Sequence, residues 1–217
     1  MLALNRKLIR AHNRIMEQNF SLDGLVGFDM HGKTVGIIGA GKIGRIVAKV
    51  LHGFGCHILV NDMVENDDLK NKYEADFTDL ITLCQQSDII TLHAPLIPKT
   101  KYLIDEFCIS NMKRGVMLIN TSRGGLVNTR EVIKALKTGQ IGHLGLDVYE
   151  EESGLFFEDH SEEILKDDVI ARLITFKNVL ITSHQGFLTD TALENIAQTT
   201  ADNLDCFLKD IPCPNEL

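Results

Sequence analysis

Long apolar runs and an excess of positive charge are both missing from this sequence of 217 residues. No stretch approaches the roughly 18 consecutive apolar residues that a membrane-spanning helix needs. Lys and Arg number 22 against 30 Asp and Glu, so the formal net charge is −8. Proteins that bind the phosphate backbone of nucleic acids concentrate Lys and Arg, which argues against such binding as the main activity. We therefore expect neither a membrane role nor a nucleic-acid partner.

Cysteine spacing gives no sign of a disulfide framework or of a zinc site. The number of cysteines is odd, and no two of them form a CxxC pair. We expect no bound metal, and this cysteine usage fits the reducing cytoplasm best. The five cysteines are Cys56, Cys84, Cys108, Cys206 and Cys213.

The first fourteen residues allow two interpretations. They are basic and contain no acid before Glu17, as in an organellar transit peptide. Their apolar residues Leu4, Leu8, Ala11 and Ile15 also recur at helical spacing. We favour the second interpretation, an amphipathic helix that packs on a core.

From Gly32 onward, short β-branched runs alternate with longer helical stretches. This alternation predicts a doubly wound α/β fold, in which helices cover both faces of a parallel sheet. The connection over residues 150–178 is longer than usual, and such connections are often functional. The predicted strands are Thr34–Ile38, Cys56–Val60, Asp88–Leu92, Val116–Asn120, His143–Val148 and Val179–Thr182. The predicted helices are Lys42–Phe54, Phe77–Gln86, Asp105–Met112, Thr129–Lys137 and Thr191–Leu208.

A GxGxxG motif at residues 39–44, the glycine loop, lies between the first predicted strand and its helix. In this context Gly39 permits a tight turn and Gly41 lets the backbone approach a pyrophosphate. Gly44 lets the helix lie close to the strand. The helix beginning near Lys42 directs its free N–H groups and positive dipole end at phosphates. A structural turn without a ligand is the less favoured alternative.

An acidic residue, Asp62, follows the next predicted strand, 18 residues after Gly44. A carboxylate there can accept hydrogen bonds from the adenosine ribose and would repel the 2′-phosphate of NADP. No Lys or Arg occurs between Asp62 and Asp68 to attract that phosphate. The sequence therefore predicts NAD as the cofactor, although a solvated carboxylate at a strand end is the plainer alternative.

Three polar clusters follow predicted strands in the second half of the chain, at the sheet edge where ligands bind. They contain Arg123, the pair Asp147 and Glu152, and His184. Singly, each has a plain explanation: a surface ion pair, a solvated acidic run and a satisfied histidine. Together they supply a carboxylate-binding cation, an orienting acid and a group that titrates near neutral pH. That combination suits reduction of a keto acid.

These motifs resemble the D-isomer-specific 2-hydroxyacid dehydrogenases, and within them the bacterial fermentative D-lactate dehydrogenases. The resemblance extends over essentially the whole chain, and residues 155–159 with 183–185 point to lactate enzymes rather than other branches. Its segments are Leu4–Lys7, Asn19–Leu22, Gly39–Gly44, Asn120–Gly124, Asp147–Glu152 and Cys213–Leu217.

The resemblance implies a role for each site residue. His184 would be the acid/base that protonates the substrate carbonyl, and Glu152 would hydrogen-bond its imidazole and raise its pKa. Arg123 would bind the substrate carboxylate, and Asp147 would contact the nicotinamide end. The pyrophosphate would lie along Lys42 and Ile43, and the two riboses would be lined by Ala94, Pro95, Thr100, Thr121 and Ser122.

The family is also built from two domains, of which this chain resembles only one. We expect a hinge or dimer helix over 1–28, an NAD-binding domain over 29–190, and a hinge helix with tail over 191–217. About 100 residues of substrate domain would be absent. The chain is then expected to bind NAD, to form a homodimer, and to be weakly active or inactive toward 2-keto acids such as pyruvate.

Two other hypotheses about the function remain open. One is a non-catalytic NAD-binding module, either a remnant of an enzyme or a sensor like the corepressors related to the family. A more distant one is a nucleotide domain of the alanine dehydrogenase or homocysteinase kind. The spacing from Asp147 to Glu152 and the later His184 count against that last reading.

Overall fold

The chain forms two compact units, Met1–Ser183 and His184–Leu217, which are described separately. The computed structural model describes residues 1–215, so the last two residues of the expected tail, Glu216 and Leu217, lie outside the described part. No helix in the described residues is both long enough and apolar enough to cross a membrane.

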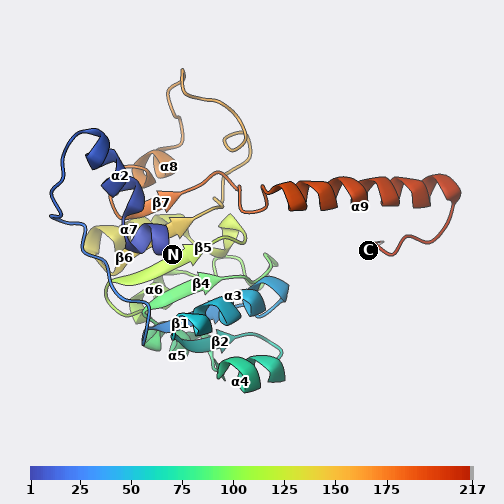
Figure 1. Ribbon diagram of the computed structural model, residues 1–217, viewed down its shortest axis with the longest axis horizontal. Coiled ribbons are helices and arrows are strands. Elements are labelled where there is room, and N and C mark those ends of the chain that lie inside the picture. The colour runs from blue at the N-terminus through green and yellow to red at the C-terminus, as the bar shows by residue number, and fades with distance from the viewer. Residues whose placement is uncertain (216–217) are drawn as a thin grey trace. The chain divides into compact units, whose positions relative to one another are not determined.

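Parallel strands build the sheet of the first unit (Figure 1). In the described residues these are β1 (Thr34–Ile38), β2 (His57–Asn61), β3 (Asp76–Phe77), β4 (Ile89–Leu92), β5 (Val116–Asn120), β6 (Ile141–Leu146) and β7 (Val179–Ile181). They lie side by side in the order β3-β2-β1-β4-β5-β6-β7, and every pairing is parallel. The order reverses between β1 and β4, as in a doubly wound Rossmann-like fold. The predicted fold class is therefore confirmed.

Helices connect these strands and cover both faces of the sheet. In the first unit they are α1 (Leu2–Asn5), α2 (Leu8–Met16), α3 (Lys42–Gly53), α4 (Asp67–Tyr73), α5 (Leu80–Gln86), α6 (Glu106–Asn111), α7 (Thr129–Thr138) and α8 (Asp168–Leu173), with a 3-10 turn η1 (Gly124–Leu126). Side chains of α5, α6, α7 and α8 share one hydrophobic core, and those of α1, α3 and α4 share another. In β4, Ile90 belongs to the first core and its neighbour Ile89 to the second, since successive strand residues face opposite sides.

Some elements differ from the sequence prediction. The expected helix at the N-terminus is broken at Lys7, whose φ of 50° is left-handed, and Leu8 and Ile15 remain exposed instead of packing on the core. Phe77, predicted to begin a helix, pairs with Val60 in the short strand β3. The helix begins only at Leu80, because the Asp79 carboxylate accepts hydrogen bonds from the backbone N–H groups of its first turn. Helices α4 and α8 were not predicted.

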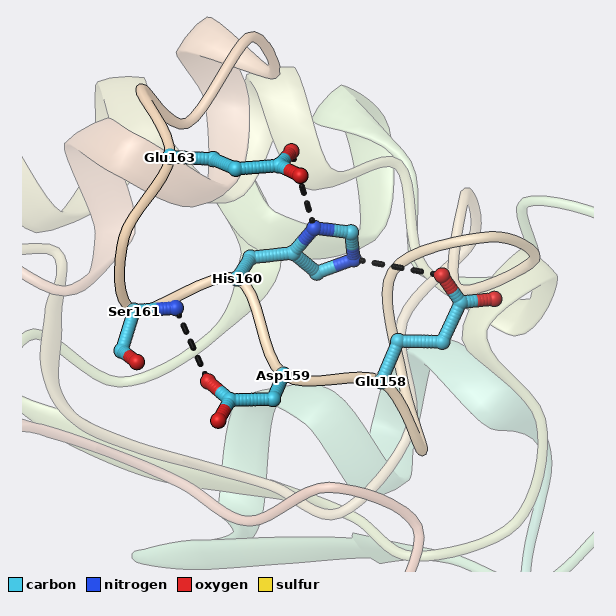
Figure 2. Close-up of polar contacts among 5 residues, drawn as sticks. All are labelled: Glu158, Asp159, His160, Ser161 and Glu163. Carbon is cyan, nitrogen blue, oxygen red and sulfur yellow. Dashed lines mark hydrogen bonds and ion pairs between the residues drawn. The ribbon is translucent and has the colours of Figure 1, made fainter.

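The long connection over residues 150–178 is anchored to Tyr149, the residue that precedes it. The hydroxyl of Tyr149, which is buried, donates a hydrogen bond of 2.7 Å to Oδ2 of Asp167, and Oδ1 of Asp167 caps α8. Figure 2 shows His160 between two carboxylates, with Nδ1 at 3.4 Å from Glu163 and Nε2 at 3.6 Å from Glu158. The Tyr149 contact thus anchors Asp167 of the connection, and the His160 contacts lie within the connection itself.

The second unit consists chiefly of one long helix, α9 (Asp190–Lys209). The hydroxyl of Thr189 caps its N-terminus by accepting from the Ala192 amide. Its C-terminus is closed at Asp210, which takes a left-handed φ of 52°. The chain then turns back along the helix through residues 211–215.

Candidate functional site

The polar segments that follow β1 and β4 meet at the point where the strand order reverses. The His93 amide donates a hydrogen bond of 2.7 Å to the Ile38 carbonyl, which joins the ends of the two strands. Gly39 has a left-handed φ of 93°, and a Cβ there would lie 2.5 Å from the Ala94 nitrogen. Only glycine fits both demands. In parallel sheets this reversal point is where ligands bind.

The other two glycines of the loop shape the start of α3. A Cβ on Gly44 would lie 2.0 Å from the Gly39 carbonyl oxygen, so the helix could not approach the strand with any larger residue. Gly41 has nothing within 4 Å of its Cβ position, and Lys42 and Ile43 are exposed beside it. This open space at the N-terminus of a helix of 12 residues suits a pyrophosphate, which would meet free N–H groups and the positive dipole end.

Asp62, which follows β2, is hydrogen-bonded to the glycine loop. Its Oδ2 accepts from the Ala40 amide at 2.5 Å, and its Oδ1 accepts from the Val64 amide at 3.1 Å. The carboxylate is exposed beside the loop, where an adenosine ribose would lie. The first basic residue beyond it, Lys70, is paired with Glu65. The residues present therefore fit NAD better than NADP.

The end of β4 contributes a half-buried histidine that the sequence analysis did not single out. His93 forms a 3.0 Å hydrogen bond between Nε2 and the Thr91 hydroxyl, and burial lowers its pKa to about 4. Its imidazole is therefore neutral at neutral pH. Ala94 beyond it is buried and Pro95 is exposed. The Thr100 hydroxyl donates to the Pro95 carbonyl at 2.6 Å, so it closes this loop on itself.

The loop after β5 is held by Asn120, a fully buried side chain. Its Oδ1 accepts from the Ser122 amide at 3.1 Å, and its Nδ2 donates to the Arg123 carbonyl at 2.9 Å. The Ser122 hydroxyl donates to the Ala94 carbonyl at 2.8 Å, which ties this loop to the one after β4. Thr121 is exposed on the same loop.

Arg123 itself is exposed, and its Nη1 donates to the Ser122 carbonyl at 2.8 Å. Within the part of the chain that the structure describes, no carboxylate pairs with this guanidinium. The neighbouring Gly124 is packed so tightly that a Cβ would lie 2.0 Å from the Tyr149 carbonyl carbon. A rigid loop thus presents a cation that can bind a carboxylate with two parallel hydrogen bonds.

The acidic pair after β6 occupies two different environments. Asp147 is buried, and its Oδ1 accepts from the Thr182 hydroxyl at 2.5 Å. Glu152 is half-buried, and its Oε2 accepts from the Tyr149 amide at 3.1 Å. Both carboxylates therefore sit at the same edge of the sheet as Arg123, since all strands are parallel.

His184 belongs to the second unit. It has a left-handed φ of 50°, and its ring meets Phe187 edge-on with 6.4 Å between centroids. The site residues from Gly39 to Glu152 are brought together along one edge of the first unit. The association of His184 with Arg123 and Glu152 stays a prediction.

Sequence reasoning gave no role to His93, and it included Asn120 only as the first residue of the segment Asn120–Gly124. Both are polar residues at the end of an apolar strand, directly before a loop that carries site residues. The Asn120 side chain is buried and hydrogen-bonded, and it holds the loop that follows, whereas the His93 side chain bonds Thr91 within β4. That position in the sequence was the available signal.

Comparison with known proteins gives consistent matches. The family profile described as "D-isomer specific 2-hydroxyacid dehydrogenase, NAD binding domain" matches residues 1–186. The 2-hydroxyacid dehydrogenase A of Aspergillus oryzae is 50% identical over 214 residues, which is 99% of this chain and 61% of that protein. The D-lactate dehydrogenase of Escherichia coli is 48% identical over 217 residues, which is 100% of this chain and 66% of that protein.

A solved structure shows the same correspondence. The D-lactate dehydrogenase of Aquifex aeolicus, complexed with NAD and lactic acid, matches with a TM-score of 0.88 at 37% identity. The match covers 96% of this chain and 63% of that one. This chain thus spans less than two thirds of the length of these relatives.

Proposed function

Because this chain belongs to the D-isomer-specific 2-hydroxyacid dehydrogenases, we propose that it is the NAD-binding portion of an enzyme that reduces a 2-keto acid such as pyruvate to the D-2-hydroxy acid. NAD is the cofactor of this domain family. The observation that carries the proposal is the exposed guanidinium of Arg123. It lies on a loop that the Ser122 hydroxyl ties to Ala94, in the loop after β4.

The cofactor would lie across the sheet edge at the reversal point. When bound, the reduced nicotinamide supplies the hydride. The glycine loop with Lys42 and Ile43 would bind the pyrophosphate, and Asp62 would hydrogen-bond the adenosine ribose. The remaining contacts would come from the loops after β4, β5 and β6. Their residues are Ala94, Pro95, Thr100, Thr121, Ser122, Arg123 and Asp147.

Arg123 would bind and orient the substrate. A planar guanidinium matches the two oxygens of a carboxylate, which fixes the keto acid in one orientation. Its charge would also polarise the carbonyl that is reduced. Lysine offers a point charge without that fork, so Arg123→Lys should weaken substrate binding more than it alters cofactor binding.

His184 would supply the proton that the carbonyl oxygen takes up, and Glu152 would orient its imidazole. A carboxylate beside a histidine favours the charged form and raises the pKa of the imidazole. That keeps the proton donor available near neutral pH. In the reverse direction the neutral imidazole would accept the proton from the hydroxy acid.

This chain by itself is proposed to bind NAD and to be weakly active or inactive. Hydride transfer needs a closed site that positions the keto acid and excludes water. The longer relatives contain further chain beyond the region matched here. We also propose that the protein works in the cytoplasm as a homodimer through its nucleotide-binding domain.

The test is to titrate the chain with NADH, followed by fluorescence, and then to assay pyruvate reduction. Saturable NADH binding with weak or no turnover supports the proposal. Lack of NADH binding would contradict it, and so would turnover as fast as that of a complete two-domain enzyme. If turnover is measurable, two variants test which residues cause it. Arg123→Lys should raise KM for pyruvate at least tenfold, and His184→Ala should abolish turnover.

Matched controls are available in the same chain. Arg130→Lys changes an exposed arginine on α7, and His57→Ala changes an exposed histidine at the start of β2. Both should leave KM and turnover unchanged. An unchanged KM in Arg123→Lys would remove Arg123 from the substrate site.

A further inference from the structure

The C-terminal segment brings two of the free cysteines together. Cys206 lies in the last turn of α9, and Cys213 lies in the segment that turns back after the helix. The Ile211 amide donates to the Cys206 carbonyl at 3.1 Å, which starts the return of the chain along α9. Both thiols are partly exposed, and Cys213 lies near enough to Cys206 to raise the pKa of its thiol.

The returning segment is anchored on the face of α9 that carries Cys206. The Cys213 thiol donates to Oδ1 of Asn203 at 3.0 Å, and Nδ2 of Asn215 donates to the same oxygen at 2.8 Å. Asn203 and Cys206 are three residues apart in the helix, so their side chains are neighbours on its surface. The Asn215 contact involves neither sulfur atom, and it holds the segment that contains Cys213 beside Cys206.

A second pair of cysteines provides an internal comparison. Cys84 on α5 and Cys108 on α6 lie in one hydrophobic core, and each shifts the pKa of the other, but their exposed fractions are 0% and 5%. A reagent in solution cannot reach these sulfur atoms without opening the core between the two helices. In both pairs the two cysteines are neighbours, but only the thiols of Cys206 and Cys213 can be reached by a reagent in solution.

We propose that Cys206 and Cys213 are a redox site that forms a reversible disulfide by exchange with a low-molecular-weight disulfide. In the first step one protein thiolate attacks a sulfur of the reagent, forms a mixed disulfide and releases one small thiol. In the second step the other protein thiolate attacks the protein-bound sulfur and releases the second small thiol. The protein loses two protons and two electrons, and the reagent disulfide is reduced to two thiols.

Charge near the site favours one kind of reagent. Burial and the neighbouring Cys213 raise the pKa of the Cys206 thiol, and the carboxylates of Asp202 and Asp205 act in the same direction. Lys209 is paired with Asp205 at 2.8 Å. A negatively charged disulfide is repelled by these carboxylates, whereas a positively charged one is attracted. We therefore expect cystamine to react faster than oxidised glutathione at low salt.

The experiment treats the full chain with cystamine under native conditions, blocks remaining thiols with iodoacetamide and analyses tryptic peptides by mass spectrometry. Trypsin cleaves after Lys209, so the disulfide would join two peptides that are separate in the reduced protein. The expected result is that joined pair, released by dithiothreitol, with Cys84 and Cys108 recovered as thiols that alkylate only in urea.

Two variants complete the test. Cys213→Ser should stop at a stable mixed disulfide on Cys206, and Cys206→Ser at one on Cys213. Mixed disulfides on both cysteines of the unaltered chain, without the joined pair, would overturn the proposal. So would a joined pair between Cys84 and Cys108 that forms at the same rate, because access would then not distinguish the two pairs.

Discussion

The Ala40 amide donates a hydrogen bond of 2.5 Å to Oδ2 of Asp62, so the acid after β2 fastens the glycine loop after β1. The carboxylate proposed to bind the adenosine ribose thus also fixes the loop proposed to bind the pyrophosphate. Its charge and its hydrogen-bond acceptor can be removed separately. An asparagine keeps an acceptor for the Ala40 amide without the charge, whereas an alanine keeps neither.

Substitution of Asp62 should separate cofactor choice from loop stability. Asp62→Asn should lower the ratio of NADH to NADPH affinity about tenfold, because the repulsion of the 2′-phosphate is lost. Asp62→Ala should do the same and also lower the free energy of unfolding by about 1 kcal/mol, because the Ala40 amide loses its acceptor. Fluorescence titration with each cofactor and urea denaturation measure the two effects.

The control for this prediction is Asp67→Asn, an exposed acid in the first turn of α4. It should leave the cofactor preference unchanged. If Asp62→Asn bound NADPH no better, relative to NADH, than this control does, Asp62 would not determine the choice of cofactor.

Two glycines of α3 should respond oppositely to alanine. Gly44→Ala places a Cβ 2.0 Å from the Gly39 carbonyl oxygen, so helix and loop must separate. We expect a loss of about 1–3 kcal/mol in the free energy of unfolding, together with weaker NADH binding. Gly53→Ala meets nothing within 4 Å and should be neutral or stabilising by up to about 1 kcal/mol. Equal unfolding midpoints in urea would refute the close approach at Gly44.

His93 should make stability depend on pH. Burial lowers its pKa from 6.5 to about 4, so the unfolded chain takes up a proton more readily than the folded one. This contribution is fully present above pH 6.5 and is lost as the pH falls toward 4. By linkage, the loss amounts to about 3 kcal/mol.

The measurement is urea denaturation of the unaltered chain and His93→Gln between pH 7 and pH 4. Glutamine stays neutral and can still hydrogen-bond the Thr91 hydroxyl, so the stability difference between the two proteins should shift by about 3 kcal/mol over this range. His143, whose pKa is also lowered by burial and by Lys7, titrates in both proteins and cancels. A pH-independent difference would show that His93 does not titrate abnormally.

Tyr149→Phe should loosen the connection over residues 150–178. The change removes the 2.7 Å hydrogen bond from the Tyr149 hydroxyl to Asp167 and leaves that carboxylate with one partner fewer. Hydrogen bonds to charged groups contribute about 1.5–3 kcal/mol, so trypsin should cleave faster at Lys166. Tyr73→Phe is the control, because within residues 1–215 the Tyr73 hydroxyl makes no hydrogen bond, so this variant should be cleaved at the rate of the unaltered chain. Equal rates in both variants would contradict the anchoring role.

The sheet could be predicted largely from the sequence because its strands are buried and bounded by clear signals. Thr34–Ile38 and Val116–Asn120 were predicted with the bounds that β1 and β5 have. Helix α4 was missed because Leu69 is its only buried residue, which leaves no apolar periodicity to detect. Strand β3 is two residues long, too short for any alternation to register.

The motif residues could be located from the sequence, whereas the contacts that organise them could not. The glycine loop and Asp62 stand out by type and spacing, but the hydrogen bond between Ala40 and Asp62 depends on β1 and β2 lying side by side. The same holds for Ser122 and Ala94, which come from loops after neighbouring strands. Contacts between loops are tertiary and leave no local pattern.

The reversal of strand order between β1 and β4 also bears on how the protein folds. Val35 of β1 pairs with Ile89 of β4, and no two strands that follow each other in the chain can form a hairpin when all are parallel. Non-local pairing of this kind slows folding, because a long loop must close before any contact compensates for its lost entropy. During synthesis on the ribosome, the residues that pack against the glycine loop are all present only after Ala94 has emerged. Cofactor binding therefore reports on the assembly of both halves of the sheet, and added NAD should pull refolding molecules toward the native state by binding only the assembled form.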